Sequence, residues 1–263
     1  MNMLRVLFSY RGFILGNVKR EFKLKYQNSL LGAAWNVINP LSMIIVYTVV
    51  FSQVMHAKLP QVDNSFAYSI YLCSGILTWG LFSEIAGRAQ NVFLENANLL
   101  KKINFPRICL PATVLCNSLL NFSIIFGLFV LFLIITGLFP GLKFFALIPV
   151  LFVLVLFAIG LGITVGILNV FFRDIGQLFG IILQFWFWFT PIVYPLDILP
   201  PQIQTLLAIN PMVGVIHACQ TILVYSEWPD WISLLPALVL GVLLVMFGMR
   251  LFRNHAGEIV DEI

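Results

Sequence analysis

The stretch FFALIPVLFVLVLFAIGLGITVGILNV, residues Phe144–Val170, decides the fold, because it contains no Lys, Arg, Asp or Glu. An α-helix rises about 1.5 Å per residue, so a helix of this length covers the ~30 Å hydrocarbon core of a bilayer. Barrel strands alternate apolar and polar residues and are only about 10 residues long, so a continuous apolar run excludes them. The stretch therefore predicts a membrane-spanning helix, which satisfies its own backbone hydrogen bonds in lipid.

Five more apolar stretches accompany it, and together they predict six spans. The chain is 60% hydrophobic and only 10% charged, whereas about a quarter of the residues in a soluble domain are charged. We therefore expect an all-α integral membrane protein in which residues 1–263 form a single transmembrane domain. The expected spans lie at about 33–55, 66–83, 112–136, 144–170, 176–193 and 231–249.

None of these spans carries a charged residue in its middle. Carriers driven by protons or sodium normally hold ionisable groups there, because those groups couple the ion to the substrate. An ion-coupled carrier is therefore disfavoured, and the energy for any transport is expected to come from outside the spans. Besides an ion-coupled carrier and a transporter energised from outside its spans, a third functional class is a scaffold subunit with no transport activity of its own.

The distribution of Lys and Arg predicts the orientation. With the N-terminus in the cytoplasm, all of the 15 Lys and Arg residues except Lys58 and Lys143 fall on the cytoplasmic side. The positive-inside rule therefore predicts a multi-pass protein with both termini in the cytoplasm. The net charge of +4 reflects this loop bias, attracts anionic membrane lipids and gives no reason to expect nucleic acid.

The N-terminal segment 10–31 reads as an amphipathic helix on the cytoplasmic membrane surface. Its apolar residues recur at helical spacings, and basic residues fall between them. Two interpretations stay open: a simple surface anchor, or a gating element beside a pore. The apolar residues are Phe13, Ile14, Val18, Phe22 and Tyr26, and the basic ones are Lys19, Arg20, Lys23 and Lys25.

The longest cytoplasmic loop is expected to contain a short helix at 91–102, and Glu84 and Arg88 are spaced to form an i,i+4 pair before it. Phe105-Pro106-Arg107 ends the short helix, because the residue before a proline is pushed away from helical angles. A second cytoplasmic turn carries Arg173-Asp174. It is either a salt-bridged turn at the headgroups or a contact to a cytoplasmic partner.

On the outer side, the proline-rich segment 195–230 carries no Lys or Arg. Its apolar pieces, Ile203–Ile209 and Val213–Tyr225, are too short or too interrupted to span the membrane. We expect re-entrant half-helices that dip into the outer leaflet and return.

Five consecutive aromatic residues, Phe185–Phe189, lie within the fifth expected span, away from the headgroup level where Trp and Tyr normally gather. Aromatic faces stack on sugar rings, so these residues suit the wall of a channel for a glycan. Core packing or lipid contact is the competing interpretation, and some of the five must face away from any channel. The channel candidates are Tyr47, Phe51, Tyr68, Tyr71, Phe185, Trp186, Trp188 and Phe189.

The sequence lacks the common motifs of nucleotide-binding, metal-binding and catalytic sites. It contains no GxxxxGK[ST] phosphate loop, no HExxH, no GxSxG and no CxxC pair. We therefore expect neither an enzyme nor a metal site, and no cofactor bound by this chain. The four cysteines read as small apolar packing residues.

A series of short motifs, in order along nearly the whole chain, gives the sequence a resemblance to a known family. It resembles the membrane-spanning permease of O-antigen and capsular polysaccharide ABC exporters, which belong to the type 2 ABC exporters. The motifs are Lys25-Tyr26, Ser29, Leu31-Gly32, Trp35, Pro40, Asn98–Lys102, Phe105-Pro106-Arg107, Pro111, Phe172–Ile175, Thr190–Pro195 and Asn210-Pro211.

The resemblance implies a homodimer in the bacterial inner membrane that forms a continuous channel. Two copies of a separate subunit, which binds ATP and Mg, would dock underneath. Segment 10–31 would be a gate helix and segment 91–102 a coupling helix seated in the ATPase. The residues implied at that interface are Asn98, Leu99, Lys101, Lys102, Phe105, Pro106, Arg107, Arg173 and Asp174.

The resemblance also implies the cargo, a polysaccharide on undecaprenyl diphosphate that moves from cytoplasm to periplasm. Clustered cations suit phosphate, so the gate-helix residues Lys19, Arg20, Lys23, Lys25 and Tyr26 become the candidates for holding the diphosphate. O-antigen is the expected cargo. The alternatives on the same fold are capsular polysaccharide, teichoic acid, and a drug or lipid.

Overall fold

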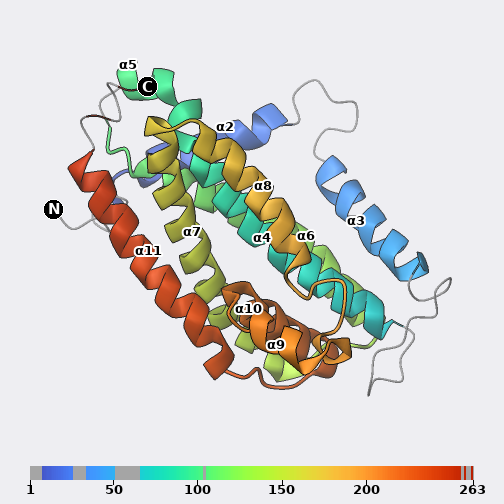
Figure 1. Cartoon of the computed structure of the whole chain (residues 1–263). Coiled ribbons are helices and arrows are strands. Elements are labelled where there is room, and N and C mark those ends of the chain that lie inside the picture. The colour runs from blue at the N-terminus through green and yellow to red at the C-terminus, as the bar shows by residue number, and fades with distance from the viewer. Residues whose placement is uncertain are drawn as a thin grey trace.

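The computed structural model describes residues 8–25, 34–50, 66–102 and 105–255, together with positions 258 and 262. Within these residues every regular element is a helix, as the sequence predicts. Figure 1 shows α4, α6, α7, α8 and α11 running side by side as a bundle. The short helices α9 and α10 gather at one end of the bundle, and α5 lies at the other.

Four long helices correspond to the second, third, fourth and sixth expected spans. They are α4 (Ala67–Glu95), α6 (Cys109–Ile135), α7 (Leu147–Phe171, entered through a 3-10 turn at Gly141–Ala146) and α11 (Leu235–Asn254, entered through Ile232–Leu234). Each is long and apolar enough to cross a membrane. Helix α4 continues well past the expected end of its span at Ser83, because nothing in the sequence between Ser83 and Glu95 breaks a helix.

Two helices are shorter than the spans expected at 33–55 and 176–193. Helix α3 covers Trp35–Tyr47 and continues in a π-type turn to Val50; positions 33 and 51–55 lie outside the described residues. Helix α8 covers Asp174–Trp188, about 22 Å at the usual helical rise. It ends before the Thr190-Pro191 step, because a proline disfavours helical angles in the residue before it.

Small residues bring α4 and α7 into backbone contact. A Cβ atom added at Gly162 would lie 2.5 Å from the Cβ of Ala89, and one added at Gly166 would lie 2.7 Å from the Ala89 carbonyl oxygen. Gly and Ala recur at helix contacts in membranes because they permit this close approach. On the neighbouring part of the core, the rings of Phe82 and Phe157 stack with their centroids 5.5 Å apart.

The two apolar pieces of segment 195–230 form a bent pair of helices. Helix α9 covers Pro201–Leu207, and α10 covers Pro211–Gln220 and continues in a π-type turn through Tyr225. The two axes are bent by 105° at the intervening break. The side chain of Asn210 caps α10 by accepting a hydrogen bond from the backbone N–H of Met212, and Pro211 takes the first helical position that suits proline.

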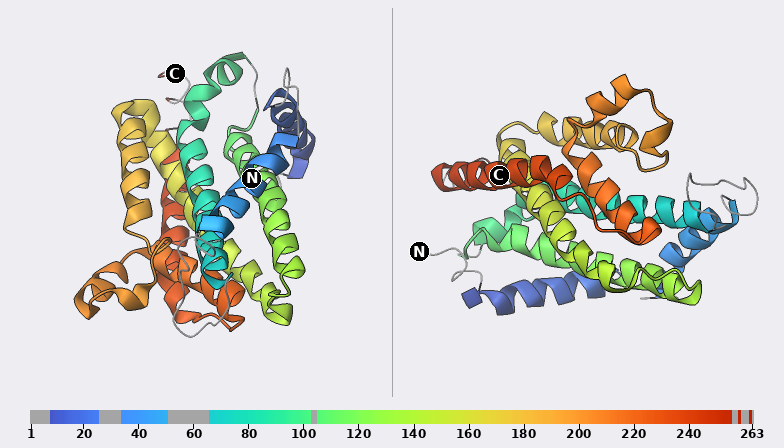
Figure 2. Two further views of the ribbon diagram at one scale, coloured as in Figure 1. Left: turned by 90° about the vertical axis from the view of Figure 1, so that its right-hand side faces the viewer. Right: turned by 90° about the horizontal axis from the view of Figure 1, so that it is seen from below.

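Two further segments predicted to be helical form helices with altered bounds. Helix α2 covers Arg11–Lys25 and lies alongside α6 (Figure 2); the rest of the predicted segment, 26–31, lies outside the described residues. The short helix α5 covers Ala97–Lys102 and not 91–102, because α4 continues to Glu95 and the Asn96 amide, at the break, bonds the Val92 carbonyl.

Candidate functional site

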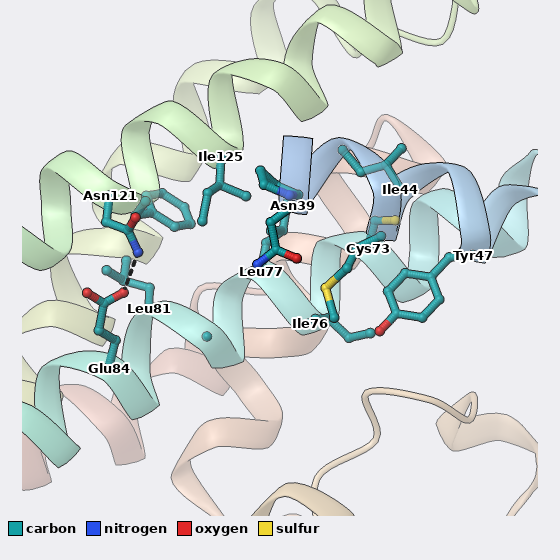
Figure 3. Close-up of a pocket in the computed structure, with 14 residues that line it drawn as sticks. Asn39, Ile44, Tyr47, Cys73, Ile76, Leu77, Leu81, Glu84, Asn121 and Ile125 are labelled. Carbon is teal, nitrogen blue, oxygen red and sulfur yellow. Dashed lines mark hydrogen bonds between the residues drawn. The ribbon is translucent and has the colours of Figure 1, made fainter. Parts of the chain in front are cut away.

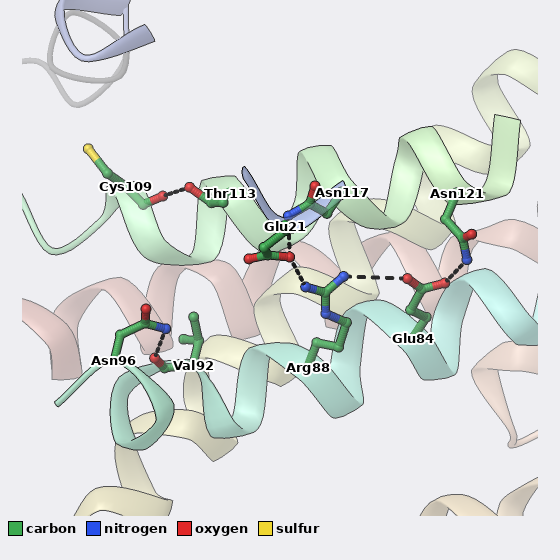
Figure 4. Close-up of polar contacts among 9 residues, drawn as sticks. All are labelled: Glu21, Glu84, Arg88, Val92, Asn96, Cys109, Thr113, Asn117 and Asn121. Atoms are coloured by element: carbon green, nitrogen blue, oxygen red, sulfur yellow. Dashed lines mark hydrogen bonds and ion pairs between the residues drawn. The ribbon is translucent and has the colours of Figure 1, made fainter. Parts of the chain in front are cut away.

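A row of polar side chains joins α2, α4 and α6 (Figure 4). At its centre, the Arg88 guanidinium contacts Glu21 Oε2 at 2.5 Å and Glu84 Oε1 at 3.6 Å. The i,i+4 pair of Glu84 and Arg88 predicted from the sequence is therefore confirmed. Glu21 was not singled out by the sequence reasoning, since its partner on α4 is 67 positions away.

Two asparagines of α6 complete the row. Asn117 donates to Glu21 Oε2 at 2.6 Å, and Asn121 donates to Glu84 Oε2 at 2.8 Å. Their spacing of four residues puts both amides on one face of α6. The sequence signal for them was available, because polar amides are uncommon within an otherwise apolar span and usually have a reason to be there.

This polar row lines one of two adjoining cavities. The polar cavity has a volume of about 380 Å³ and is also lined by Phe22, Leu24 and Leu120. The second cavity, about 210 Å³, lies between α3, α4 and α6 and is mostly apolar (Figure 3). Glu84 and Asn121 line both cavities. A cavity lined by charged and amide groups therefore adjoins a mostly apolar one, an arrangement that suits an amphiphile.

Three basic residues in the second half of α2 are exposed, and one of them, Arg20, also lines a small pocket with Arg88 and Glu95 of α4. Ile14 and Val18 are buried against the core and Glu21 joins the polar row, whereas Lys19, Arg20 and Lys23 are exposed. Helix α2 therefore buries Ile14 and Val18 against the core and leaves these three cations exposed, together with Leu15, Phe22 and Leu24. The side chain of Lys25 and the whole of Tyr26, both candidates for the diphosphate, lie outside the described part of the chain.

The residues implied at an ATPase interface gather at one end of the bundle. Asn98 and Lys101 on α5 are exposed, as are Arg173 and Asp174 at the start of α8 (Figure 1). Leu99, Pro106 and Arg107 are half-buried, and the side chain of Lys102 is not described. Phe105 is different, because it is buried and its ring lies 4.8 Å from that of Phe13 on α2.

The aromatic run of α8 divides between two faces. The Trp186 side chain packs inside the subunit, with ring centroids 5.4 Å from Phe82 and 6.1 Å from Phe157. In contrast Phe185, Trp188 and Phe189 are each at least 60% exposed. Of the channel candidates on α8, these three are the residues that α8 presents outward.

The tyrosines of α4 hold the chain that follows α8. Tyr68 donates its hydroxyl to the Val193 carbonyl at 2.6 Å, and Tyr71 lies 3.1 Å from the Tyr194 carbonyl. The Tyr194 hydroxyl donates to the Trp188 carbonyl at 2.9 Å, and partial burial raises the pKa of Tyr194 above its ordinary value. Tyr47 lines the apolar cavity, and Phe51 lies outside the described residues.

Comparison with known proteins gives the family. The model of the ABC-2 type transporter family matches residues 14–224. The chain is 28% identical to the O-antigen export system permease protein RfbA of Myxococcus xanthus, and the match covers the full length of both proteins.

Two further relatives agree. The RfbA permease of Klebsiella pneumoniae is 28% identical over 89% of this chain and 88% of its own. The polysialic acid transport protein KpsM of Escherichia coli is 21% identical over 90% of each chain. The family match covers most of the sequence, and the apolar helices fit a membrane-spanning protein. The chain therefore belongs to the ABC-2 type transporter family, and its relatives include permeases named for O-antigen export and a protein named for polysialic acid transport.

Proposed function

We propose that this chain is the channel-forming subunit of an ATP-driven exporter that moves polysaccharide on undecaprenyl diphosphate from cytoplasm to periplasm. O-antigen is the favoured cargo. The observation that carries the proposal is the similarity over the full length of the chain to a permease named for O-antigen export. The adjoining polar and apolar cavities support it, because a lipid-linked glycan has both characters.

The proposed architecture has six spans per subunit in the bacterial inner membrane. Helices α3 and α8 supply the first and fifth spans, and the bent pair α9–α10 dips into the outer leaflet and returns. Both termini are cytoplasmic, in keeping with the bias of Lys and Arg. The absence of charged residues from the middle of the expected spans supports an energy source outside this subunit.

That energy source is a separate ATP-binding subunit, present in two copies beneath a homodimer of this chain. ATP and Mg bind to the partner. Its docking surface on this chain comprises α5, through Asn98 and Lys101, and the turn before α8, through Arg173 and Asp174. The exposure of these four side chains at one end of the bundle supports this assignment.

The cargo meets α2 first. Lys19, Arg20 and Lys23 hold the diphosphate, because clustered cations at a membrane surface attract phosphate. The polar cavity beside them is lined by carboxylates, amides and an arginine, which are hydrogen-bonding partners for sugar hydroxyls. The apolar cavity accommodates part of the prenyl chain. Further along the path, Trp188 and its exposed neighbours on α8 stack on sugar rings.

Export of a capsular polysaccharide is the second candidate, favoured by the match to KpsM of Escherichia coli. Teichoic acid, or a drug or lipid, would use the same frame. The cavities do not distinguish among these cargoes. The cargo must therefore be identified by chemical analysis of the transported material.

Deletion of the gene followed by localisation of cellular glycan tests the proposal. Lipid-linked polysaccharide should accumulate in the cytoplasm and disappear from the surface, and the trapped material identifies the cargo. Surface glycan at wild-type levels with no trapped intermediate would refute the polysaccharide function.

Complementation of the deletion strain tests the diphosphate site. A variant with Lys19, Arg20, Lys23 and Lys25 replaced by Gln should insert normally but restore little surface glycan. The matched control, Arg250→Gln with Arg253→Gln, removes cytoplasmic charge from the end of α11 and should restore export. Equal export by the two variants would refute the role of the α2 cations.

A further inference from the structure

One buried amide joins three helices near the end of the bundle that carries α5. Asn169, in the last turn of α7, is 2% exposed. Its Nδ2 donates to the Gln90 carbonyl at 3.1 Å and to Asn91 Oδ1 at 3.2 Å, both on α4. Its Oδ1 accepts the backbone N–H of Gly176, on α8, at 2.9 Å. A single side chain therefore bonds α7 to both α4 and α8.

For α8, Asn169 acts as a cap supplied from another helix. The first N–H groups of a helix have no partner within the helix and need one from elsewhere. Helix α8 begins at Asp174, and Arg173 at its N-cap position makes no side-chain capping bond. Gly176 is the third helical residue, a usual target of a capping side chain. Asn169, reaching back across the α7–α8 turn, satisfies this N–H.

Asn169, Gln90, Asn91 and Gly176 together form what we call the joint between α7, α4 and α8. Asn169 and Gly176 are packed closely within it. A Cβ at Gly176 would lie 2.6 Å from Asn169 Oδ1, a separation that real Cβ atoms do not adopt. One turn earlier on α7, Gly166 brings the helix into backbone contact with α4. Interiors packed this closely transmit displacement and do not absorb it. A movement of the cytoplasmic end of α4 must therefore be followed by α7 and by the start of α8.

A second amide is held at the joint despite an energetic cost. Gln90 is 7% exposed, and its Nε2 lies 3.4 Å from the Gly176 carbonyl. Its Oε1 is buried without a hydrogen-bond partner among the described residues. Leaving a buried acceptor unpaired costs about 1–3 kcal/mol. The Gln90 contact to Gly176 ties α4 directly to the same residue of α8 that Asn169 caps.

The two helices held by this joint lead to the two segments assigned above to the ATPase. Helix α4 is followed, after Asn96, by α5, and the Arg173-Asp174 turn opens α8. We infer that Asn169 is a positioning residue which locks these two segments into one rigid unit, so that ATP-driven movement reaches the span helices. The inference rests on the proposed function for the presence of an ATPase, and it concerns transmission, not cargo.

Variants at the joint separate this role from general stability. Asn169→Ala removes all three hydrogen bonds, and Gly176→Ala displaces the amide by filling its space. The control is Thr164→Val, on the same helix. The Thr164 hydroxyl is within 2.8 Å of the Gly160 carbonyl and 3.2 Å of the Leu244 carbonyl on α11. This change also removes a hydrogen bond between helices, but one that joins α7 to α11 and not to α4 or α8.

The measurement is glycan exported per ATP hydrolysed, using the permease purified with its ATPase and reconstituted with its lipid-linked glycan. Each joint variant should lower this ratio roughly tenfold, within the ~5- to 150-fold typical of coupling between sites. The double variant should be no worse than either single one, because both break the same contact. Thr164→Val should keep the wild-type ratio. A wild-type ratio in correctly inserted Asn169→Ala would overturn the inference.

A second readout does not depend on the cargo. Spin labels at N98C and D174C, in a variant lacking the native cysteines, report the distance between the two ATPase-facing segments. The distance distribution should be narrow with Asn169 present and broad in Asn169→Ala. An equally narrow distribution in both would overturn the inference. Failure of wild-type protein to export glycan, with the distances behaving as expected, would instead refute only the proposed function.

Discussion

Trp186 donates its indole N–H to Oδ1 of Asn210 at 2.8 Å, and this bond joins the last turn of α8 to the start of α10. Asn210 is bonded on both sides of its amide. Its Oδ1 also accepts from Met212, and its Nδ2 donates to the Phe189 carbonyl at 3.2 Å and to Thr190 Oγ1 at 3.0 Å. The indole is therefore part of the framework that holds the bent pair against the bundle.

Replacing Trp186 by Phe should lower the stability of the protein while an aromatic ring still packs between α8 and the core. The ring still fills part of the space against Phe82 and Phe157, but the hydrogen bond to Asn210 is lost. We expect a loss of about 1 kcal/mol, the usual net value of one hydrogen bond. Unfolding of the purified protein in detergent, followed by intrinsic fluorescence or circular dichroism, measures it.

Replacing Trp188 by Leu is the contrasting change. Trp188 is 61% exposed and makes no comparable contact to the interior through its indole N–H among the described residues, so its loss should leave the unfolding transition within about 0.5 kcal/mol. If Trp188 stacks on the cargo, glycan export should nevertheless fall. Export at the wild-type rate would assign Trp188 to lipid or subunit contact.

Phe105 and Lys101 should fail in different ways, although both were predicted at the ATPase interface. Phe105→Ala leaves a hole against Phe13 and should cost about 3 kcal/mol, as is usual for buried Phe→Ala changes. Lys101→Ala removes an exposed cation and should cost almost no stability, but should reduce recovery of the ATPase with the permease. Co-purification and thermal unfolding, measured on both variants, separate the two effects.

The opposite pattern would contradict the assignment. If Lys101→Ala retains the full amount of ATPase while Phe105→Ala loses it without loss of stability, the partner contacts the loop and not the exposed face of α5.

The close contact between α4 and α7 predicts that Gly→Ala changes at two positions differ in their effect on stability. Gly166→Ala places a methyl group against the Ala89 carbonyl, which is backbone and cannot turn aside, so we expect a loss of about 1–3 kcal/mol. Gly180→Ala on α8 is the matched control, because a Cβ there meets nothing within 4 Å. Alanine forms helix better than glycine, so the control should gain about 0.5–1 kcal/mol. Equal unfolding midpoints would contradict the contact.

Much of the fold was predictable because hydropathy and helix-breaking prolines act locally in the sequence. Apolar length predicted α6, α7 and α11, and the prolines predicted the break between α9 and α10. The ends of α4 and α8 were less predictable. Helix α4 runs on past the apolar stretch since polar residues are also good helix formers, and α8 stops at Trp188 because of the backbone restriction before Pro191.

The candidate site was less predictable, because it depends on pairing between distant residues. The spacing of Glu84 and Arg88 is local and was predicted, whereas Glu21 and Asn117 reach the same network only after folding. Periodicity likewise placed five aromatics on one helix but did not distinguish the face carrying Trp186 from the face carrying Trp188. The indole of Trp186 is held inward by its bond to Asn210, the residue that caps α10.

The network around Glu21 also has a consequence for the order of biosynthesis. Glu21 is bonded to Arg88 and to Asn117, which follow it by 67 and 96 positions in the chain. At about 5–20 residues per second, a ribosome takes roughly 5 to 20 seconds to extend the chain from Glu21 to Asn117. During that interval the side-chain partners that fix α2 have not all been made. Helix α2 is thus among the first segments to be synthesised, yet it reaches its final position only after α6 has entered the membrane.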